Sequence, residues 1–191
     1  MTALITLEDY KAYKGITKTD SDEKLSLIIG SVDALVKNYC GHSFVDYYTT
    51  PKVEYFNINP AQDAIFLNEW PVRTVSLVQQ RISYDDSYET VEAVEYYVDP
   101  NHDTVYYHNG YWPEGKGSVK VTYTAGSATP PEDIRIACLD LVHHYFKEEY
   151  KESKTIGAVN VNNNSSMGKS TAASSTWPGH ILRVLNLYKN G

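Results

Sequence analysis

The sequence predicts an α+β protein in which a small helical bundle carries an inserted antiparallel β region. Three observations predict this fold class. Residues 20–41 repeat apolar side chains in steps of three and four, the spacing of one helical face. Residues 42–124 change to a period of two, which is typical of half-buried strands, and residues 129–150 return to the helical period. At 191 residues the chain is long enough to bury a core without disulfide bonds.

A short helix is expected at residues 6–14. Thr6 is suited to cap its N-terminus, and Asp9 stands at the third helical position, as in a capping box. Gly15 should end the helix because glycine adopts the left-handed conformation at low cost.

The second helix is expected to run from Asp20 to Gly41, with Asp20 and Glu23 as a capping box. Gly30 interrupts it and is expected on the solvent face, or at a point where another backbone passes closely. We expect residues 1–41 to form a helical hairpin domain. The apolar face of this helix comprises Leu25, Ile28, Ile29, Val32, Leu35, Val36, Tyr39 and Cys40.

Residues 42–124 are expected to form a domain of meandering antiparallel sheet, because short alternating stretches are separated by turn residues. The expected strands are Phe44–Tyr48, Val53–Ile58, Ala64–Leu67, Thr74–Arg81, Val94–Val98, Thr104–Tyr107 and Ser118–Thr124.

A second long helix is expected after Thr129, with residues 125–150 as the corresponding domain. Thr129 is suited to cap the helix, Pro130 to occupy its first position and Glu132 to close a capping box. The expected end is near Tyr150, after a charged and solvated stretch. The buried face comprises Ile134, Ala137, Cys138, Leu141, Val142 and Tyr145.

Residues 151–191 are expected to form a flexible arm that ends in a short docking helix. Residues 155–176 are rich in Asn, Ser, Ala and Gly and hold few side chains that could be buried. The amphipathic helix that follows needs a docking site, either on the core of its own subunit or on another molecule. Its candidate anchors are Trp177, Ile181, Leu182, Leu185 and Tyr188.

Charge and composition exclude several classes of protein. The net charge is −7, from 17 basic and 24 acidic residues, and no basic block is present. This disfavours a protein that grips nucleic-acid phosphates. No apolar stretch reaches 18 residues and no signal peptide is visible, so we expect a soluble protein made in a cytoplasm. Cys40 and Cys138 are expected to be reduced core thiols, with a disulfide between them as the alternative.

The sequence contains no recognisable catalytic motif, cofactor-binding motif or metal-binding motif. The nearest approach to a metal site is His143 and His144 with Glu148, for which a solvated or interface surface is the favoured interpretation. We therefore expect no enzyme, no cofactor and no metal. An enzyme that uses the two histidines is the minor alternative.

Tyrosine is unusually frequent, with 17 residues against four phenylalanines. Tyrosine suits half-buried strands and protein interfaces because its ring is apolar and its edge polar. Tyr106, Tyr107, Tyr111 and Trp112 could form a platform for a sugar or for single-stranded nucleic acid. We favour sheet packing and subunit contact for these four residues. A tyrosine-rich module that binds carbohydrate or protein is the alternative function.

Several short motifs follow one another in a fixed order along the chain. A long helix ends in Tyr39-Cys40-Gly41-His42-Ser43-Phe44, and the β segment is entered through Pro71-Val72-Arg73-Thr74-Val75. Tyr123 to Gly126 then precedes a helix that starts around Pro131 to Asp133. This order resembles the head–tail connector (adaptor) proteins of long-tailed bacteriophages, and the resemblance covers about residues 4–150.

The resemblance implies a structural virion protein at the head–tail interface, made in the cytoplasm of a host bacterium. Adaptors of this family form a ring, expected here to be a dodecamer, beneath the portal protein after DNA packaging. They extend the DNA channel and join a neck, head-completion or tail-terminator protein. DNA would pass through the lumen without specific binding, and the C-terminal helix would dock on the portal or on an adjacent subunit.

Overall fold

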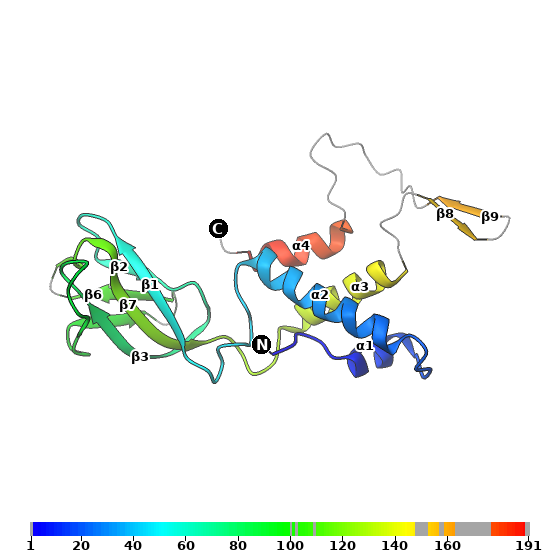
Figure 1. Ribbon diagram of the computed structural model, residues 1–191, viewed down its shortest axis with the longest axis horizontal. Coiled ribbons are helices and arrows are strands. Elements are labelled where there is room, and N and C mark those ends of the chain that lie inside the picture. Colours follow the sequence, from blue (N-terminus) through cyan, green and yellow to red (C-terminus); the bar gives the residue numbers. More distant parts are fainter. Residues whose placement is uncertain are drawn as a thin grey trace. The chain divides into compact units, whose positions relative to one another are not determined.

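The computed structural model describes residues 2–99, 101, 103–108, 110–147, 153–156, 159–162 and 177–189 (Figure 1). The chain divides into a β unit, Met1–Thr2 with Gly41–Pro130, and a helical unit, Ala3–Cys40 with Pro131–Gly191. Helices and antiparallel sheets are thus segregated along the chain, and the predicted α+β class is confirmed. None of the helices in the described part is long and apolar enough to span a membrane.

The helical unit begins with α1, Leu7–Lys14, which has the expected caps. The Thr6 side chain accepts a hydrogen bond from the Asp9 backbone N–H, and the Asp9 side chain accepts one from the Thr6 backbone N–H, forming the predicted capping box. Gly15 follows the helix with φ 64°, in the left-handed region.

Helix α2, Asp22–Cys40, begins two residues later than predicted. Asp20 lies in a turn, and the first helical hydrogen bond runs from the Leu25 backbone N–H to the carbonyl of Ser21. Most of the predicted apolar face is buried, but Leu35 is 40% exposed. Gly30 is exposed, as expected.

Helix α3, Glu132–Phe146, does not use the predicted capping box. Pro131 occupies the N-cap position, and no side chain caps the helix. Pro130 precedes another proline, which disfavours the helical conformation, so it lies outside the helix. The helix ends at Phe146, and the predicted extension to Tyr150 runs into residues outside the described ranges.

Both cysteines are free and buried in the helical unit, which confirms the prediction of reduced thiols. Burial raises the pKa of Cys40 to about 11 and that of Cys138 to about 12, so both remain protonated and unreactive at neutral pH.

The β unit contains two antiparallel sheets. The first has the strand order β1-β7-β3-β4 and the second the order β2-β6-β5. Their bounds are Lys52–Ile58 (β1), Ala64–Phe66 (β2), Val72–Gln80 (β3), Glu89–Thr90 (β4), Tyr96–Asp99 (β5), Thr104–Tyr107 (β6) and Gly115–Ala125 (β7).

The predicted meander is wrong, although most of the predicted strands exist. β7, the last strand of the unit, pairs with β1 on one side and with β3 on the other, so sequential order does not give spatial order. The expected strand Phe44–Tyr48 is a series of bends and turns, because Phe44 has φ 66°, a value that no strand accommodates. The two-residue strand β4 was not predicted.

One hydrophobic core serves both sheets. Residues of β2 and β6 pack with residues of β1, β3 and β7, and this cluster includes Trp112. Its buried members are Ile58, Ile65, Leu67, Val78, Val91, Val105, Trp112, Val119, Val121, Tyr123 and Ala125.

The C-terminal arm includes a short hairpin, β8 (Ser153–Ile156) with β9 (Val159–Asn162), within the stretch predicted to be a flexible linker. Its alternation of Val with Asn favours a strand more than its low apolar content suggests. The rest of the linker, residues 157–158 and 163–176, lies outside the described residues. Helix α4, Gly179–Leu187, is the last element in the described residues.

Candidate functional site

Helix α4 packs on α2 and α3 of its own chain, beside α2 in Figure 1. Ile181 and Leu185 are 1% and 0% exposed, respectively, because their spacing of four residues places both on the same side of the helix. Leu182 is half-buried, and Leu187 is 77% exposed. The amphipathic pattern predicted for this segment is therefore present, and its apolar side is covered by the helical unit.

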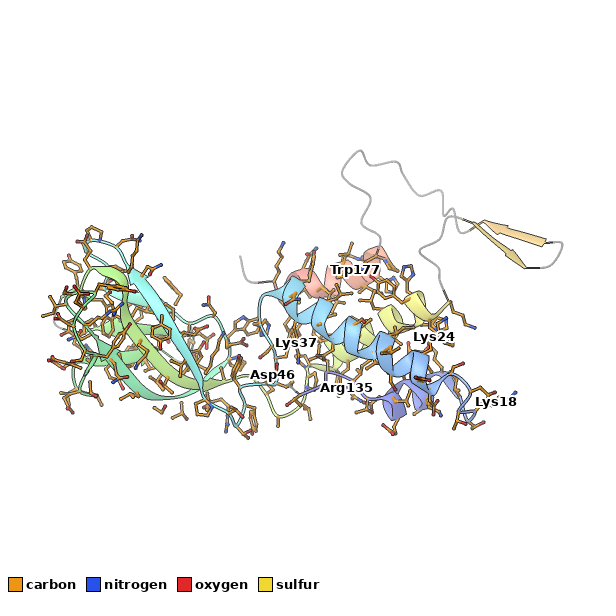
Figure 2. All side chains as sticks on the ribbon, viewed as in Figure 1. Lys18, Lys24, Lys37, Asp46, Arg135 and Trp177 are labelled. Carbon is orange, nitrogen blue, oxygen red and sulfur yellow. The ribbon has the colours of Figure 1, made fainter. Side chains whose placement is uncertain are left out.

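Polar contacts tie both ends of this segment to the same helices. Trp177, labelled in Figure 2, donates its indole N–H to the Tyr145 hydroxyl at 2.7 Å. The Trp177 ring lies 5.3 Å from the Tyr39 ring. At the other end, the Tyr188 hydroxyl donates to the Asp133 carboxylate at 2.9 Å. Burial, and then the hydrogen bond to that carboxylate, raise the pKa of Tyr188 to about 12, so the hydroxyl remains a donor at neutral pH.

The sequence left open whether this helix docks on its own core or on another molecule, and the structure places it on its own chain. All five candidate anchors are buried or half-buried there. Docking on a neighbouring molecule is not tested by this placement and stays a prediction.

The four aromatic residues proposed as one surface do not lie on one side of the β unit. Trp112 is 2% exposed, and Tyr107 packs against it with ring centroids 4.7 Å apart. Tyr106 is adjacent to Tyr107 on β6, so it points to the opposite side of the sheet, and it pairs with Tyr97 on β5. Tyr111 is 61% exposed. The proposal of Trp112 as an interface residue is corrected, because this ring is part of the core.

A buried polar cluster in the β unit was not predicted. The Tyr123 hydroxyl donates to Glu54 at 2.7 Å and accepts from the Glu69 backbone N–H at 3.1 Å. Lys52 forms ion pairs with both carboxylates, and Ser43 donates its backbone N–H and its hydroxyl to Glu69. The alternation of β1 could have revealed the cluster, because Glu54 is in phase with the inward residues of that strand.

The electrostatics of this cluster fit a structural role. Burial opposes the ionisation of Glu54, but hydrogen bonds from Lys52 and Tyr123 outweigh it and hold the pKa of Glu54 below its usual range. Burial also opposes the charge on Lys52, and the two carboxylates outweigh it and raise the pKa of Lys52. The paired charges thus satisfy each other and join β1 and β7 to the segments around Ser43 and Glu69.

The histidine pair on α3 is arranged differently from the sequence-based expectation. His144 is 7% exposed, so it is not on a solvated surface, and His143 Nδ1 lies 3.1 Å from the Tyr10 hydroxyl. Glu148 lies outside the described residues. Within the described ranges, no group of three or more His, Cys, Asp or Glu residues is placed to hold a metal ion.

A family model described as "Head completion protein" matches residues 3–191. The chain belongs to the head completion protein family. This confirms the resemblance to head–tail connector proteins that the motifs in the sequence indicated. A head completion protein of Escherichia phage T5 is 26% identical over 188 residues, which cover 97% of this chain and 98% of that protein.

Solved structures from gene transfer agent (GTA) particles share the fold of this head completion family member. The neck of an empty GTA particle computed with C6 symmetry has a chain with TM-score 0.63 and 14% identity, covering 100% of this chain and 94% of that one. A chain of the native GTA virion has TM-score 0.62 and 12% identity, and the match covers 98% of this chain and 90% of that chain. A chain of the native GTA neck computed with C12 symmetry has TM-score 0.57 and 14% identity, and the match covers 100% of this chain and 93% of that chain.

Proposed function

We propose that this protein is a structural virion component that completes the DNA-filled phage head and joins it to the neck and tail. The observation that carries the proposal is the family match, which spans residues 3–191. The T5 relative matches over 98% of its own length, so its description applies to the whole matched region. The role is structural, and the buried polar cluster and buried thiols serve the fold.

The copies assemble into a ring beneath the portal protein, and the expected number of copies is twelve. Two related folds come from necks computed with C6 and C12 symmetry, which supports several copies around one axis. The acidic chain lets DNA pass through the lumen with little attraction, because phosphate backbones are bound by cations. Assembly takes place in a host bacterium, and the neighbouring neck component is a head-completion or tail-terminator protein.

Electron microscopy of particles from the encoding phage, with a stop codon early in this gene, tests the proposal. DNA-filled or leaky heads beside separate, complete tails are expected, and a plasmid copy of the gene should restore whole particles. Whole particles formed without the protein would contradict the proposed function. A tyrosine-rich binding module would then become the leading alternative.

We also propose that α4 contacts the portal or an adjacent subunit in the particle. With Ile181 and Leu185 buried on the helical unit, the exposed side of α4, which includes Arg183 and Leu187, is available for this contact. Leu187→Glu should leave the isolated protein folded and lower its recovery in particles at least tenfold. Equal recovery of the variant and the wild type would contradict this part of the proposal.

A further inference from the structure

The outward side of α2 carries no charge over three turns. From Ser26 to Asn38, every exposed residue of this helix is uncharged, and we call this set the α2 face. Its members are Ser26, Leu27, Gly30, Ser31, Ala34, Leu35 and Asn38. Leu27 is 70% exposed and Leu35 40% exposed. A helix side that faces water normally includes charged residues, whereas this one combines small and uncharged polar residues with two exposed leucines, a composition that suits a protein contact.

The charged residues of the same stretch are turned inward. Lys37 Nζ lies 3.1 Å from Asp33 Oδ2, and their side chains are only 9% and 13% exposed. The other Asp33 oxygen accepts the Leu4 backbone N–H at 2.7 Å. Figure 2 labels Lys24 and Lys37, which bracket most of the α2 face along the helix. The polarity of α2 is therefore partly reversed, with an ion pair inside and leucines outside.

Gly30, at the middle of the α2 face, has no role in the described part of the chain. A glycine inside a helix costs about 1 kcal/mol relative to alanine. A Cβ atom added at Gly30 would meet nothing within 4 Å. The described fold therefore gains nothing from this glycine, whereas a neighbouring backbone that approaches closely would require it.

We propose that the α2 face packs against the next copy of this chain in the ring, an inference that rests on the proposed function. Each copy has a net charge of −7, and the acidic excess lies within the β unit, whereas acidic and basic residues balance in the helical unit. Copies of like charge repel wherever their β units face each other. The neutral helical unit, and above all its uncharged α2 face, is the surface on which two copies meet without that repulsion.

Other occupants of the α2 face fit less well. Residues 163–176 of the same chain are mainly Asn, Ser, Thr, Ala and Gly, and provide only one large apolar side chain, Met167, to cover the two leucines. DNA is bound through cations, and the α2 face has none. A contact in a ring is heterologous, so the α2 face would meet a different surface of the next copy.

Photocrosslinking in assembled particles tests this contact. A benzophenone amino acid replaces Ser31 in the full-length protein, and Lys18, exposed in the loop before α2, is replaced in the same way as a control. Irradiation should join several copies into a ladder through position 31 but not through position 18. Peptide mapping should place the acceptor outside the α2 face, as a heterologous contact requires. Crosslinks from position 31 only to DNA, to another virion protein or to a second α2 face would overturn the inference.

Leu27→Glu provides a second test that does not depend on crosslinking yield. Leu27 is exposed, so the isolated variant should unfold at the wild-type urea concentration, and recovery in particles should fall at least tenfold. Lys18→Glu, which changes the charge more, should be recovered like the wild type. If Leu27→Glu were recovered in particles at the wild-type level, the inference would be overturned. Absence of the wild-type protein from particles would instead refute the proposed function, so the two failures are distinguishable.

Discussion

His42 is a neutral histidine held in the core of the β unit. Its ring lies 4.0 Å from the Phe44 ring and 4.4 Å from the Trp70 ring, and the residue is 3% exposed. Burial, with a further contribution from the positive charge of Lys52, lowers the pKa of His42 to about 4 from an ordinary 6.5. Glu69 is the acidic group that faces this ring, at 3.8 Å.

This burial predicts a loss of stability in mild acid. Below pH 6.5 the unfolded chain binds a proton at His42 that the folded protein does not bind, so the free energy of unfolding falls until about pH 4. The contribution reaches about 3 kcal/mol. His42→Phe should keep the ring packing and flatten this part of the pH profile in urea titrations between pH 7 and 4. If the two proteins lost stability in parallel, the loss would not come from His42. Glu54 is present in both proteins, so its own titration cancels when the two pH profiles are compared.

Two glycines predict opposite effects of the same substitution. Gly126 has φ 85°, and an added Cβ would lie 2.3 Å from the Phe44 carbonyl oxygen. Gly126→Ala should therefore lower the free energy of unfolding by at least about 2 kcal/mol. Gly30→Ala should raise it by about 1 kcal/mol in the isolated protein, because the helix there has free space. Urea unfolding of both variants measures the difference, and equal destabilisation would show that Gly30 has a contact within the fold.

Helix α4 contributes to the stability of the helical unit through its buried leucine. Leu185→Ala should lower the free energy of unfolding by about 2–5 kcal/mol, since it leaves a cavity beside α2 and α3. Leu187→Ala, on the exposed side of the same helix, should change it by less than about 0.5 kcal/mol. Far-UV circular dichroism during urea unfolding measures both. Similar small effects would mean that α4 is not seated on the helical unit in solution.

The placement of α4 predicts the effect of truncating the C-terminal arm. Removal of residues 155–191 should uncover Cys40 and its neighbours, because the Cys40 thiol lies against the Leu185 carbonyl at 3.7 Å. The truncated chain is therefore expected to lose stability in the helical unit as well as any contact made by the arm.

The β unit has a core of its own and should fold without the helices. The fragment Gly41–Pro130 contains all residues of that core and the whole buried polar cluster. The purified fragment should show a strand-rich circular dichroism spectrum and one cooperative urea transition. The full-length protein is the control, and a fragment without a cooperative transition would show that the β unit depends on the helical unit.

Local patterns in the sequence were sufficient for most helices and strands. Thr6, Asp9 and Gly15 act through neighbours within four residues, and the predicted caps of α1 are present. Steps of three and four identified α2, and the strand expected at Thr104–Tyr107 coincides with β6 to the residue. Such features depend on backbone geometry and side-chain chemistry within one segment, so sequence alone determined them.

Only the tertiary structure decided what covers each surface. Period-two alternation separates Tyr106 from Tyr107 but does not say which side is inside, and Trp112 lies in a loop that has no period. Three features join residues that are far apart in the sequence. They are the pairing of β7 with β1 and β3, the packing of α4 on α2 and α3, and the polar cluster around Glu54 and Glu69. Periodicity orients a side chain relative to its own helix or strand, and burial depends on which other segment packs there. For the same reason, the uncharged α2 face became visible only once the inward ion pair of Asp33 and Lys37 was placed.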